Sequence, residues 1–570
     1  MTSDERTDEV TAPTRRQLMK TVAAVGVGTA VFQRALVAQA QQQPQSGVTA
    51  EMIKQAEWIS GIKLSDTDRE RLAQGLGQTI RSFEQLRGIK LDNGVVPAVN
   101  FHPAPWQRPN GNEPRGSVEA TAKDPPKRPD SADDLAFLPL TALAGLVRTK
   151  QVSSVELTKL YLERLHKYNP ALNCVVSFTD ELALKQAEAA DREIAAGRYR
   201  GPLHGIPWGA KDLIAYPGYK TTWGATPFKN QTIDMKATVA QKLDEAGAVL
   251  VAKTTLGALA QGDQWFGGRT NSPWNIRQGS SGSSAGSACT TAAGLVGFAI
   301  GTETRGSIIS PCTRCHVTGL RPTFGRVSRY GCMALAWTMD KLGPIARTVE
   351  DCALVFGAVH GFDGLDPCAV DRPFTWPAKR DLKTLKVGYF EPGERGGRGG
   401  RGGMAATSDD SLKVLREIGV QLVPIKLPSK YPVNALNFIL SVEAGTAFDD
   451  LTRQGVTEGL NAWVGTFRSA EFVPAVEYIR ANRVRTLFMQ EMEQVMGHVD
   501  MYVGGNDLAL TNLTGHPTVV IPNGFNGDQP MSVTFTGRLY GEAEILALAK
   551  AYQDATGHHL KRPAMEKLVQ

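Results

Sequence analysis

Apolar residues recur at helical spacing near the start of the chain and again in its main body. Met52, Ala56 and Ile59 lie three or four positions apart, and this spacing predicts helices over residues 49–87. Residues 97–132 are rich in proline, which interrupts helices and sheets, so they predict an irregular linker. The pattern therefore indicates a small helical prefix and a linker in front of a larger body.

The main body alternates helical patterns with short apolar runs. Ser153 and Glu156 have the spacing of a capping box at a helix start, and residues 181–196 are an alanine-rich helical stretch. Short apolar runs predict strands buried on both faces, at residues 248–252, 385–390, 420–423, 499–503, 518–521 and 531–535. This alternation predicts an α/β fold with a mixed, largely parallel central sheet covered by helices on both faces.

The composition is that of a folded globular protein. Hydrophobic residues make up 42% and charged residues 21% of the 570 residues, which excludes wholesale disorder. A net charge of +6 is too dilute to favour nucleic-acid binding, and the Gly-Arg repeat at residues 393–403 predicts a mobile surface loop rather than an RNA-binding segment. Seven cysteines imply no disulfide framework.

The first forty residues have the organisation of an export signal. Arg15 and Arg16 precede an uncharged stretch over residues 21–32, and Ala38-Gln39-Ala40 supplies a small-x-small cleavage site. The stretch is shorter than the roughly 20 residues that span a bilayer. Paired arginines are typical of twin-arginine signals, which export folded proteins. We therefore expect a periplasmic or otherwise exported protein with no stable membrane insertion after signal removal.

A serine- and glycine-rich segment at residues 278–288 is the most unusual stretch of the chain. It runs directly into the apolar residues 292–300, which predict a buried core strand, so a flexible linker is disfavoured. Small residues there allow the backbone to approach a ligand or another segment closely. A polar, glycine-flanked turn follows at residues 301–309, and upstream a strand-like run over residues 205–212 contains Lys211.

These segments resemble the amidase-signature family, over roughly residues 133–565. The matching motifs are Lys211-Asp212 after Gly205-Ile206-Pro207, Ser272-Pro273-Trp274, and residues 301–308, 319–328, 343–349 and 513–517. Several ordered motifs at consistent separations make the resemblance specific. It implies an amidase-signature catalytic domain (133–570) behind the signal (1–40) and the prefix and linker (41–132). No metal or cofactor is expected, since no HExxH motif or paired Cys-x-x-Cys sets occur.

The resemblance implies a serine–serine–lysine triad made of Lys211, Ser283 and Ser307. Ser283 is selected among the crowded serines because it lies nine residues after Trp274 and 24 residues before Ser307, as in the family pattern. A lysine in a desolvated pocket can lose its charge near neutral pH and act as a base, and the Ser283 hydroxyl can relay the proton of Ser307. In the family, the bridging serine has a cis peptide bond.

The oxyanion loop of this chain departs from the family pattern. The backbone N–H groups expected to receive the oxyanion are those of Thr304, Arg305, Gly306 and Ser307. Family members usually have Gly-Gly before the nucleophile, whereas this chain has Arg305-Gly306. An arginine is strained there if its φ is positive; alternatively it directs a charge at the substrate. Three further positions differ from the family, at Glu303, Ile309 and Ala285.

Three other interpretations compete with this one. Residues 282–286 fit the G-x-S-x-G elbow of α/β-hydrolases and would make Ser284 the nucleophile of an esterase, but a polar segment stands where that elbow needs a core strand. Residues 312–316 fit the c-type haem attachment pattern, although a packed pair of thiols is favoured there. The third is a non-catalytic ligand-binding protein descended from an amidase, with Arg305 disabling the oxyanion loop.

The leading hypothesis is a serine amidohydrolase that cleaves a linear small-molecule or peptide amide to acid and ammonia or amine, through an acyl-enzyme on Ser307. A component of a tRNA-dependent amidotransferase is a related alternative, but the export signal would separate the protein from cytoplasmic tRNA, ATP and partner subunits. The substrate and the oligomeric state stay open, a homodimer included. Residues 430–490 are candidates for the pocket, with aromatic side chains at Phe438, Trp463, Phe467 and Phe472.

Overall fold

The computed structural model describes residues 47–89, 99, 116–121, 126–391, 409–505 and 507–568. The predicted signal at residues 1–40 and the Gly-Arg repeat at residues 393–403 lie outside the described residues, as does most of the predicted proline-rich linker. Those expectations are neither supported nor contradicted by the fold. Within the described residues, no helix combines the length and the apolar character that crossing a bilayer requires.

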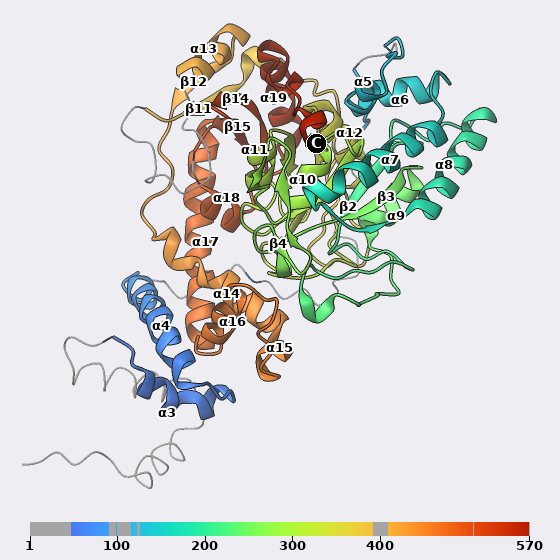
Figure 1. Ribbon diagram of the computed structural model, residues 1–570. Coiled ribbons are helices and arrows are strands. Elements are labelled where there is room, and N and C mark those ends of the chain that lie inside the picture. The colour runs from blue at the N-terminus through green and yellow to red at the C-terminus, as the bar shows by residue number, and fades with distance from the viewer. Residues whose placement is uncertain are drawn as a thin grey trace, which may run out of the picture.

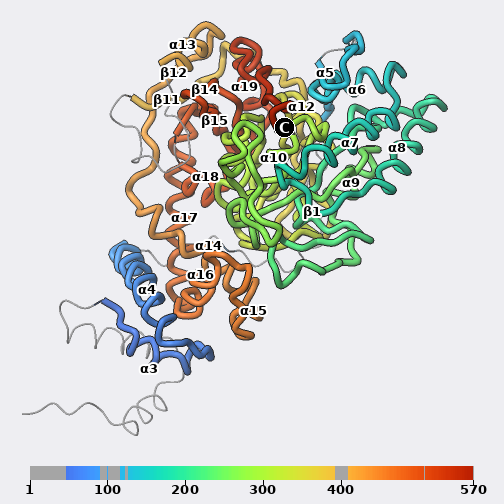
Figure 2. Tube along the Cα trace, in the orientation of Figure 1, coloured from blue at the N-terminus to red at the C-terminus, as the bar shows by residue number. Residues whose placement is uncertain are grey.

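One sheet of 11 strands runs through the main body (Figures 1 and 2). The order across the sheet is β1 (Val175–Phe178), β3 (Val249–Thr254), β2 (Pro207–Lys211), β8 (Phe298–Glu303), β10 (Lys341–Ala346), β9 (Thr318–Arg321), β14 (Thr518–Asn526), β15 (Gln529–Gly537), β13 (Met501–Val503), β11 (Lys386–Tyr389) and β12 (Gln421–Pro424). All six apolar runs that predicted strands are strands of this sheet.

The predicted mixed α/β architecture is confirmed, with a smaller parallel share than expected. Four pairings are parallel, and they form two groups, β3–β2–β8 and β13–β11–β12. The six remaining pairings are antiparallel and include the β14–β15 hairpin. A strand buried on both faces is apolar throughout in either orientation, so the apolar runs could not reveal the direction of their neighbours.

Helices cover both faces of the sheet, and alternate strand residues enter two separate cores. In β3, Val249 and Val251 pack in one core and Leu250 packs in the other. The first core includes side chains of α7 (Ser154–Leu172), α10 (Ala285–Ala292) and α11 (Ile309–Cys315). The second includes those of α9 (Thr238–Glu245), α12 (Val349–Val359) and α19 (Glu542–Thr556). Burial on both faces makes the strands near the centre rigid supports for the loops at their ends.

Two local predictions illustrate how the helices are defined. The side chain of Ser153 accepts a hydrogen bond from the backbone N–H of Glu156 at the start of α7, as the capping spacing predicts. The predicted strand over residues 292–300 is only partly correct, because α10 ends at Ala292 and β8 begins at Phe298. Helix α10 was missed because its small residues, alanine, glycine, serine and threonine, show no spaced large apolar side chains.

The helices predicted for the prefix are α3 (Ala50–Ser60) and α4 (Asp66–Arg87), at one end of the molecule (Figure 1). They pack beside α14 (Phe438–Ala447), α16 (Trp463–Ala470) and α17 (Ala475–His498). Phe83 of α4 meets Phe438 edge-on, with ring centroids 5.3 Å apart, and Arg87 forms an ion pair of 2.9 Å with buried Glu477 of α17. The prefix is therefore attached to the body through apolar and charged contacts.

The other helices of the main body are shorter or lie at its periphery. They are α5 (Ala132–Ala136), α6 (Leu140–Arg148), α8 (Asp180–Ala195), α13 (Asp409–Ile418), α15 (Asp449–Arg453) and α18 (Leu508–Thr514). Of these, α18 matters most for the site, because its side chains reach the loop that follows β8.

Candidate active site

Lys211 is the last residue of β2, a strand that lies between β3 and β8 inside the sheet. Its side chain is fully buried. The Nζ atom lies 2.8 Å from Ser283 Oγ and 3.1 Å from Ser284 Oγ. It also lies 2.8 Å from Thr302 Oγ1 and 3.3 Å from the Thr302 carbonyl oxygen. The strand therefore holds the amine among neutral hydroxyl and carbonyl groups.

Burial lowers the pKa of the Lys211 ammonium to about 7, and the more distant Asp340 and Glu303 carboxylates offset only part of this effect. The carboxylate of the adjacent Asp212 pairs with buried Lys253 at 2.8 Å instead. Among the described residues, no carboxylate lies within ion-pair distance of Lys211 Nζ. Close to neutral pH the amine is therefore half deprotonated and can accept a proton.

Ser283 lies in the serine-rich loop directly above the amine, and it is fully buried. The peptide bond between Gly282 and Ser283 is cis, the conformation that the resemblance implies for a bridging serine. The next residue connects this loop to the predicted nucleophile, since the backbone N–H of Ser284 donates to the Ser307 carbonyl oxygen at 3.1 Å. The loop that contains Ser283 and the turn that contains Ser307 are thus joined by a direct hydrogen bond.

Ser307 and Ser284 differ in how their hydroxyl groups are used. Ser307 is partly exposed, and its Oγ has no hydrogen-bond partner among the described residues. Ser284 is fully buried, and its Oγ donates to the Thr302 carbonyl at 3.0 Å while it accepts from the Thr302 N–H at 3.0 Å and from Lys211. A hydroxyl engaged on all sides is a poor candidate nucleophile, so the geometry argues against the elbow interpretation of Ser284.

Four consecutive backbone N–H groups, those of residues 304–307, have no acceptor in the part of the chain that the structure describes. The next two, of Ile308 and Ile309, both donate to Glu303 Oε2 at 2.8 and 3.0 Å. Unpaired backbone donors in a row can stabilise a negatively charged oxygen. The turn therefore leaves donors available at the side chain of Ser307.

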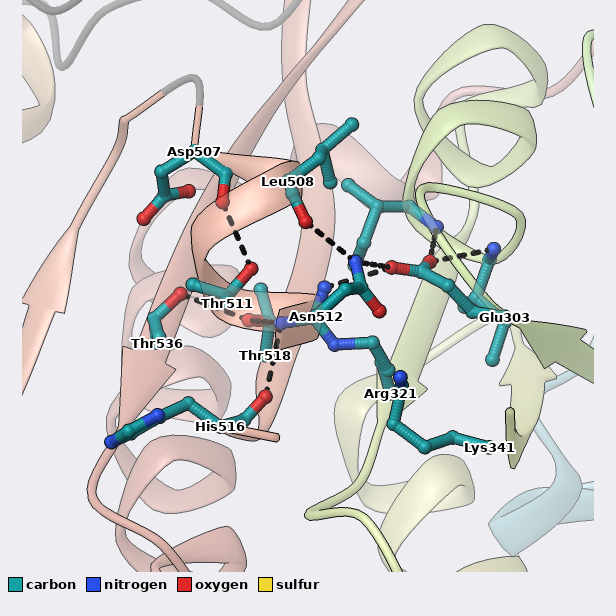
Figure 3. Close-up of polar contacts among 12 residues, drawn as sticks. Glu303, Arg321, Lys341, Asp507, Leu508, Thr511, Asn512, His516, Thr518 and Thr536 are labelled. Carbon is teal, nitrogen blue, oxygen red and sulfur yellow. Dashed lines mark hydrogen bonds and ion pairs between the residues drawn. The ribbon is translucent and has the colours of Figure 1, made fainter. Parts of the chain in front are cut away.

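Glu303 connects the turn to two distant segments of the chain (Figure 3). Its Oε1 accepts from Arg321 Nη1 and from Asn512 Nδ2 of α18, both at 2.8 Å. Arg321 also donates to the His516 carbonyl at 3.0 Å and to Thr518 Oγ1 at 2.6 Å. Although burial alone would raise it, the Arg321 guanidinium and the N–H donors hold the pKa of the Glu303 carboxyl at about 2. Glu303 is thus an anionic anchor for the turn.

Arg305 does not strain the backbone, because the residue with positive φ in this turn is Gly306, at +85°. A Cβ atom on Gly306 would lie 3.0 Å from Leu508 Cδ1 of α18, so this position also lacks space for a side chain. Arg305 itself is exposed, and its Nη1 donates to Asn437 Oδ1 at 2.9 Å. The loop therefore accommodates arginine without distortion.

The structure also locates residues that were considered for other roles. Cys312 and Cys315 of α11 are buried free thiols, as predicted for a packed pair, and burial raises the pKa of Cys312 well above its usual range. Trp463 and Phe467 are buried in the core of the main body, and Phe472 is buried against the prefix helices. Phe438 lines a cavity of about 550 Å³ between α4, α14 and α16.

Two residues of the site were not identified from the sequence. Thr302, which contacts Lys211, lies inside a matching motif but has no signal of its own, because its function depends on the neighbouring strand. Asn512 lies one position before the 513–517 motif, and a buried polar residue between Leu510 and Leu513 is the only available clue. Among the described residues, no cluster of three or more histidine, cysteine or acidic side chains is arranged to hold a metal ion.

A buried lysine, a chain of serine hydroxyls and a row of free backbone donors define a serine hydrolase of the lysine-dependent type. The chain belongs to the amidase family, whose family model, described as Amidase, matches residues 156–505. The resemblance found in the sequence motifs is thereby confirmed at the level of the family, an enzyme family that acts on C–N bonds. The twin-arginine signal stays a prediction.

Curated relatives and solved structures agree with this family. The A-type polypeptide of the glutamyl-tRNA(Gln) amidotransferase of Carboxydothermus hydrogenoformans is 32% identical over 488 residues, which cover 76% of this chain and 100% of the relative. The polypeptide of the same name from Geobacter metallireducens is 34% identical and covers 75% of this chain and 99% of its own. The peptide amidase of Stenotrophomonas maltophilia aligns with a TM-score of 0.64 at 27% identity, covering 75% and 98% of the two chains.

Proposed function

We propose that this protein hydrolyses a carboxylic acid amide to the acid and ammonia or an amine, through an acyl-enzyme on Ser307. One observation supports the proposal above the others. A buried amine with a pKa near 7 contacts the Ser283 hydroxyl, and the loop of Ser283 is hydrogen-bonded to the turn that presents Ser307. A base and a relay beside an unpaired hydroxyl are what nucleophilic attack by serine requires.

Acylation begins with a proton transfer along the three side chains. The neutral amine of Lys211 takes the proton of Ser283 Oγ as Ser283 takes the proton of Ser307 Oγ, and Ser307 Oγ bonds to the amide carbon. The carbonyl oxygen becomes an oxyanion that accepts hydrogen bonds from the N–H groups of residues 304–307. The C–N bond then breaks as the proton returns through Ser283 to the departing nitrogen, which leaves an ester on Ser307.

Deacylation uses the same groups in the same order. Water loses a proton to Lys211 through Ser283, and its oxygen bonds to the ester carbon while the row of N–H donors again stabilises the oxyanion. The bond between that carbon and Ser307 Oγ breaks, and the relay returns the proton to Ser307. The products are the free carboxylic acid and the regenerated hydroxyl, so the only co-reactant is water.

Hydrolysis without a partner protein is proposed here in preference to amidotransfer. The curated relatives are named as parts of an amidotransferase, whereas the peptide amidase among the solved structures is named for hydrolysis of an amide. We propose that the predicted twin-arginine signal exports this chain, away from tRNA and ATP. Release of ammonia or amine by the purified chain alone supports hydrolysis, and activity that appears only with added cytoplasmic partner proteins supports amidotransfer.

Labelling with a fluorophosphonate probe tests the proposed nucleophile. We expect covalent modification at Ser307, its loss in Ser307→Ala, and a strong reduction in Lys211→Ala. Ser310→Ala is a matched control, because Ser310 is also partly exposed and lies three residues further along, and we expect it to be labelled like the natural chain. Absence of labelling in a folded sample that still binds amides would favour the non-catalytic interpretation.

A further inference from the structure

Arg305 places an exposed positive charge two residues before the proposed nucleophile. The side chain leaves the turn toward the start of α14, where Nη1 donates to Asn437 Oδ1 at 2.9 Å. Among the described residues, no carboxylate lies within ion-pair distance of this guanidinium. The charge of Arg305 is therefore not neutralised inside the fold.

Asn437 holds the guanidinium in place without cancelling its charge. The asparagine is half-buried at the start of α14, and its side chain makes no capping bond with that helix. A guanidinium has five N–H donors in a planar fork, and this contact uses one of them. The fork is thus oriented by a neutral acceptor while the remaining donors stay available to a ligand.

The carboxylates near the turn all face into the protein. Glu303 is fully buried and accepts from Arg321, Asn512 and two backbone N–H groups. Asp340 accepts from Thr304 Oγ1 at 2.6 Å and from the N–H groups of residues 335 and 336 at 2.8 and 2.9 Å. With these anions occupied, Arg305 supplies the formal charge on the exposed side of the turn.

We propose that Arg305 selects amides that bear a carboxylate group close to the scissile bond, an inference that rests on the proposed function. A guanidinium binds a carboxylate through two parallel N–H···O bonds, which fix both position and orientation. Bound in this way, an anionic amide presents its carbonyl group to Ser307 and to the N–H donors of the same turn. Arg305 is in this proposal a specificity-determining residue, and it takes no part in proton transfer.

Two fluorophosphonate probes of equal length test the proposal on the purified full chain, one ending in a carboxylate and the other in an isopropyl group of similar shape. The measured quantity is the ratio of their second-order rate constants for labelling Ser307, with spacers of two, three and four methylene groups. We expect the carboxylate probe to react about tenfold faster at low ionic strength with the best spacer, and the ratio to fall as salt is added.

Variants separate the charge from the fold. We expect Arg305→Met to bring the ratio close to one, Arg305→Lys to retain part of it, and Arg305→Glu to invert it. Arg198→Met removes another exposed arginine, on the loop after α8, and should leave the ratio unchanged. Labelling of Arg305→Met by the uncharged probe at the natural rate shows that the variant is folded.

The outcomes distinguish this inference from the function on which it rests. If neither probe labels Ser307 in the natural chain, the proposed function fails and the inference fails with it. If the uncharged probe labels normally and the two rates are equal, or if the preference persists in Arg305→Met, the proposed function stands and the role of Arg305 is wrong. Hydrolysis of glutaramate, 5-methylhexanamide and 5-aminopentanamide provides the same comparison with anionic, neutral and cationic amides.

Discussion

Acylation of Ser307 should depend on pH with a midpoint near 7, because burial lowers the pKa of the proposed base, Lys211, to about 7. The reactive form is the neutral amine, so its share is about 1% at pH 5, about 9% at pH 6 and about 91% at pH 8. A lysine with the ordinary pKa of 10.5 would be neutral in only about 0.03% of molecules at pH 7. Burial therefore raises the reactive fraction at neutral pH by about three orders of magnitude.

The assay is the rate of fluorophosphonate labelling of Ser307 between pH 5 and 9, with an uncharged probe. Lys341 requires a control, since burial and the nearby Arg321 guanidinium also lower its pKa to about 7. Its ammonium donates to the Met339 carbonyl oxygen, and among the described residues it makes no hydrogen bond to Lys211 or to either serine. We expect Lys341→Met to keep the midpoint of the natural chain. A rate that is flat from pH 5 to 9, or a midpoint near 10, would refute the proposed role of Lys211.

The same shift has a consequence for stability. The pKa of Lys211 is about 7 in the folded chain and near 10.5 when the chain unfolds, so between these values the unfolded state binds one more proton. The free energy of unfolding therefore rises with pH across this window, by about 1.4 kcal/mol per unit from this group. Lys211→Met lacks the contribution, so the stability of the natural chain relative to this variant should increase by about 2–3 kcal/mol from pH 7 to 9. Denaturant unfolding at both pH values measures it, and a difference independent of pH would contradict the reasoning.

Three further substitutions probe the rest of the site. Ser283→Ala should slow labelling of Ser307 by about 10²–10⁴, whereas Ser284→Ala should slow it much less, and equal losses would remove the distinction between relay and support. Glu303→Gln should lower the free energy of unfolding by about 3–5 kcal/mol, because its buried guanidinium partner loses its counter-charge, and should lower kcat more than it raises KM; unchanged urea unfolding would contradict this. Gly306→Ala should cost about 1–3 kcal/mol, since its φ of +85° is unfavourable for alanine, and a Tm equal to that of the natural chain would argue against strain.

The fold could be predicted where the pattern along the chain is local. The apolar runs mark the strands, and Ser153 marks the start of α7 through a contact only three residues away. Strand direction and order could not be predicted, since they depend on pairings such as β9 with β14, which lie about two hundred residues apart. Helix α10 was hidden because its residues are small, and only the surrounding tertiary packing makes them helical.

The candidate site was predictable as far as its motifs are contiguous. Lys211, Ser283 and Ser307 each lie in a distinct segment, and the structure brings those segments together. The partners that hold the turn in place could not be found in this way. Asn437 contacts Arg305 across 132 residues, and Asn512 contacts Glu303 across 209 residues, and neither asparagine belongs to a pattern that announces a contact at such a separation.

Lys211 and Glu303 show how two fully buried ionisable groups in one site have opposite charge states at neutral pH. The Glu303 carboxylate has a guanidinium, an amide and two backbone N–H groups as donors, so ionisation is stabilised and the anion persists. Lys211 has only hydroxyl and carbonyl neighbours, because Lys253 occupies the carboxylate of Asp212, and desolvation therefore favours the neutral amine. A permanent charge suits a group that anchors the oxyanion turn, and a removable charge suits a base, so the two environments assign the two roles without any difference in depth of burial.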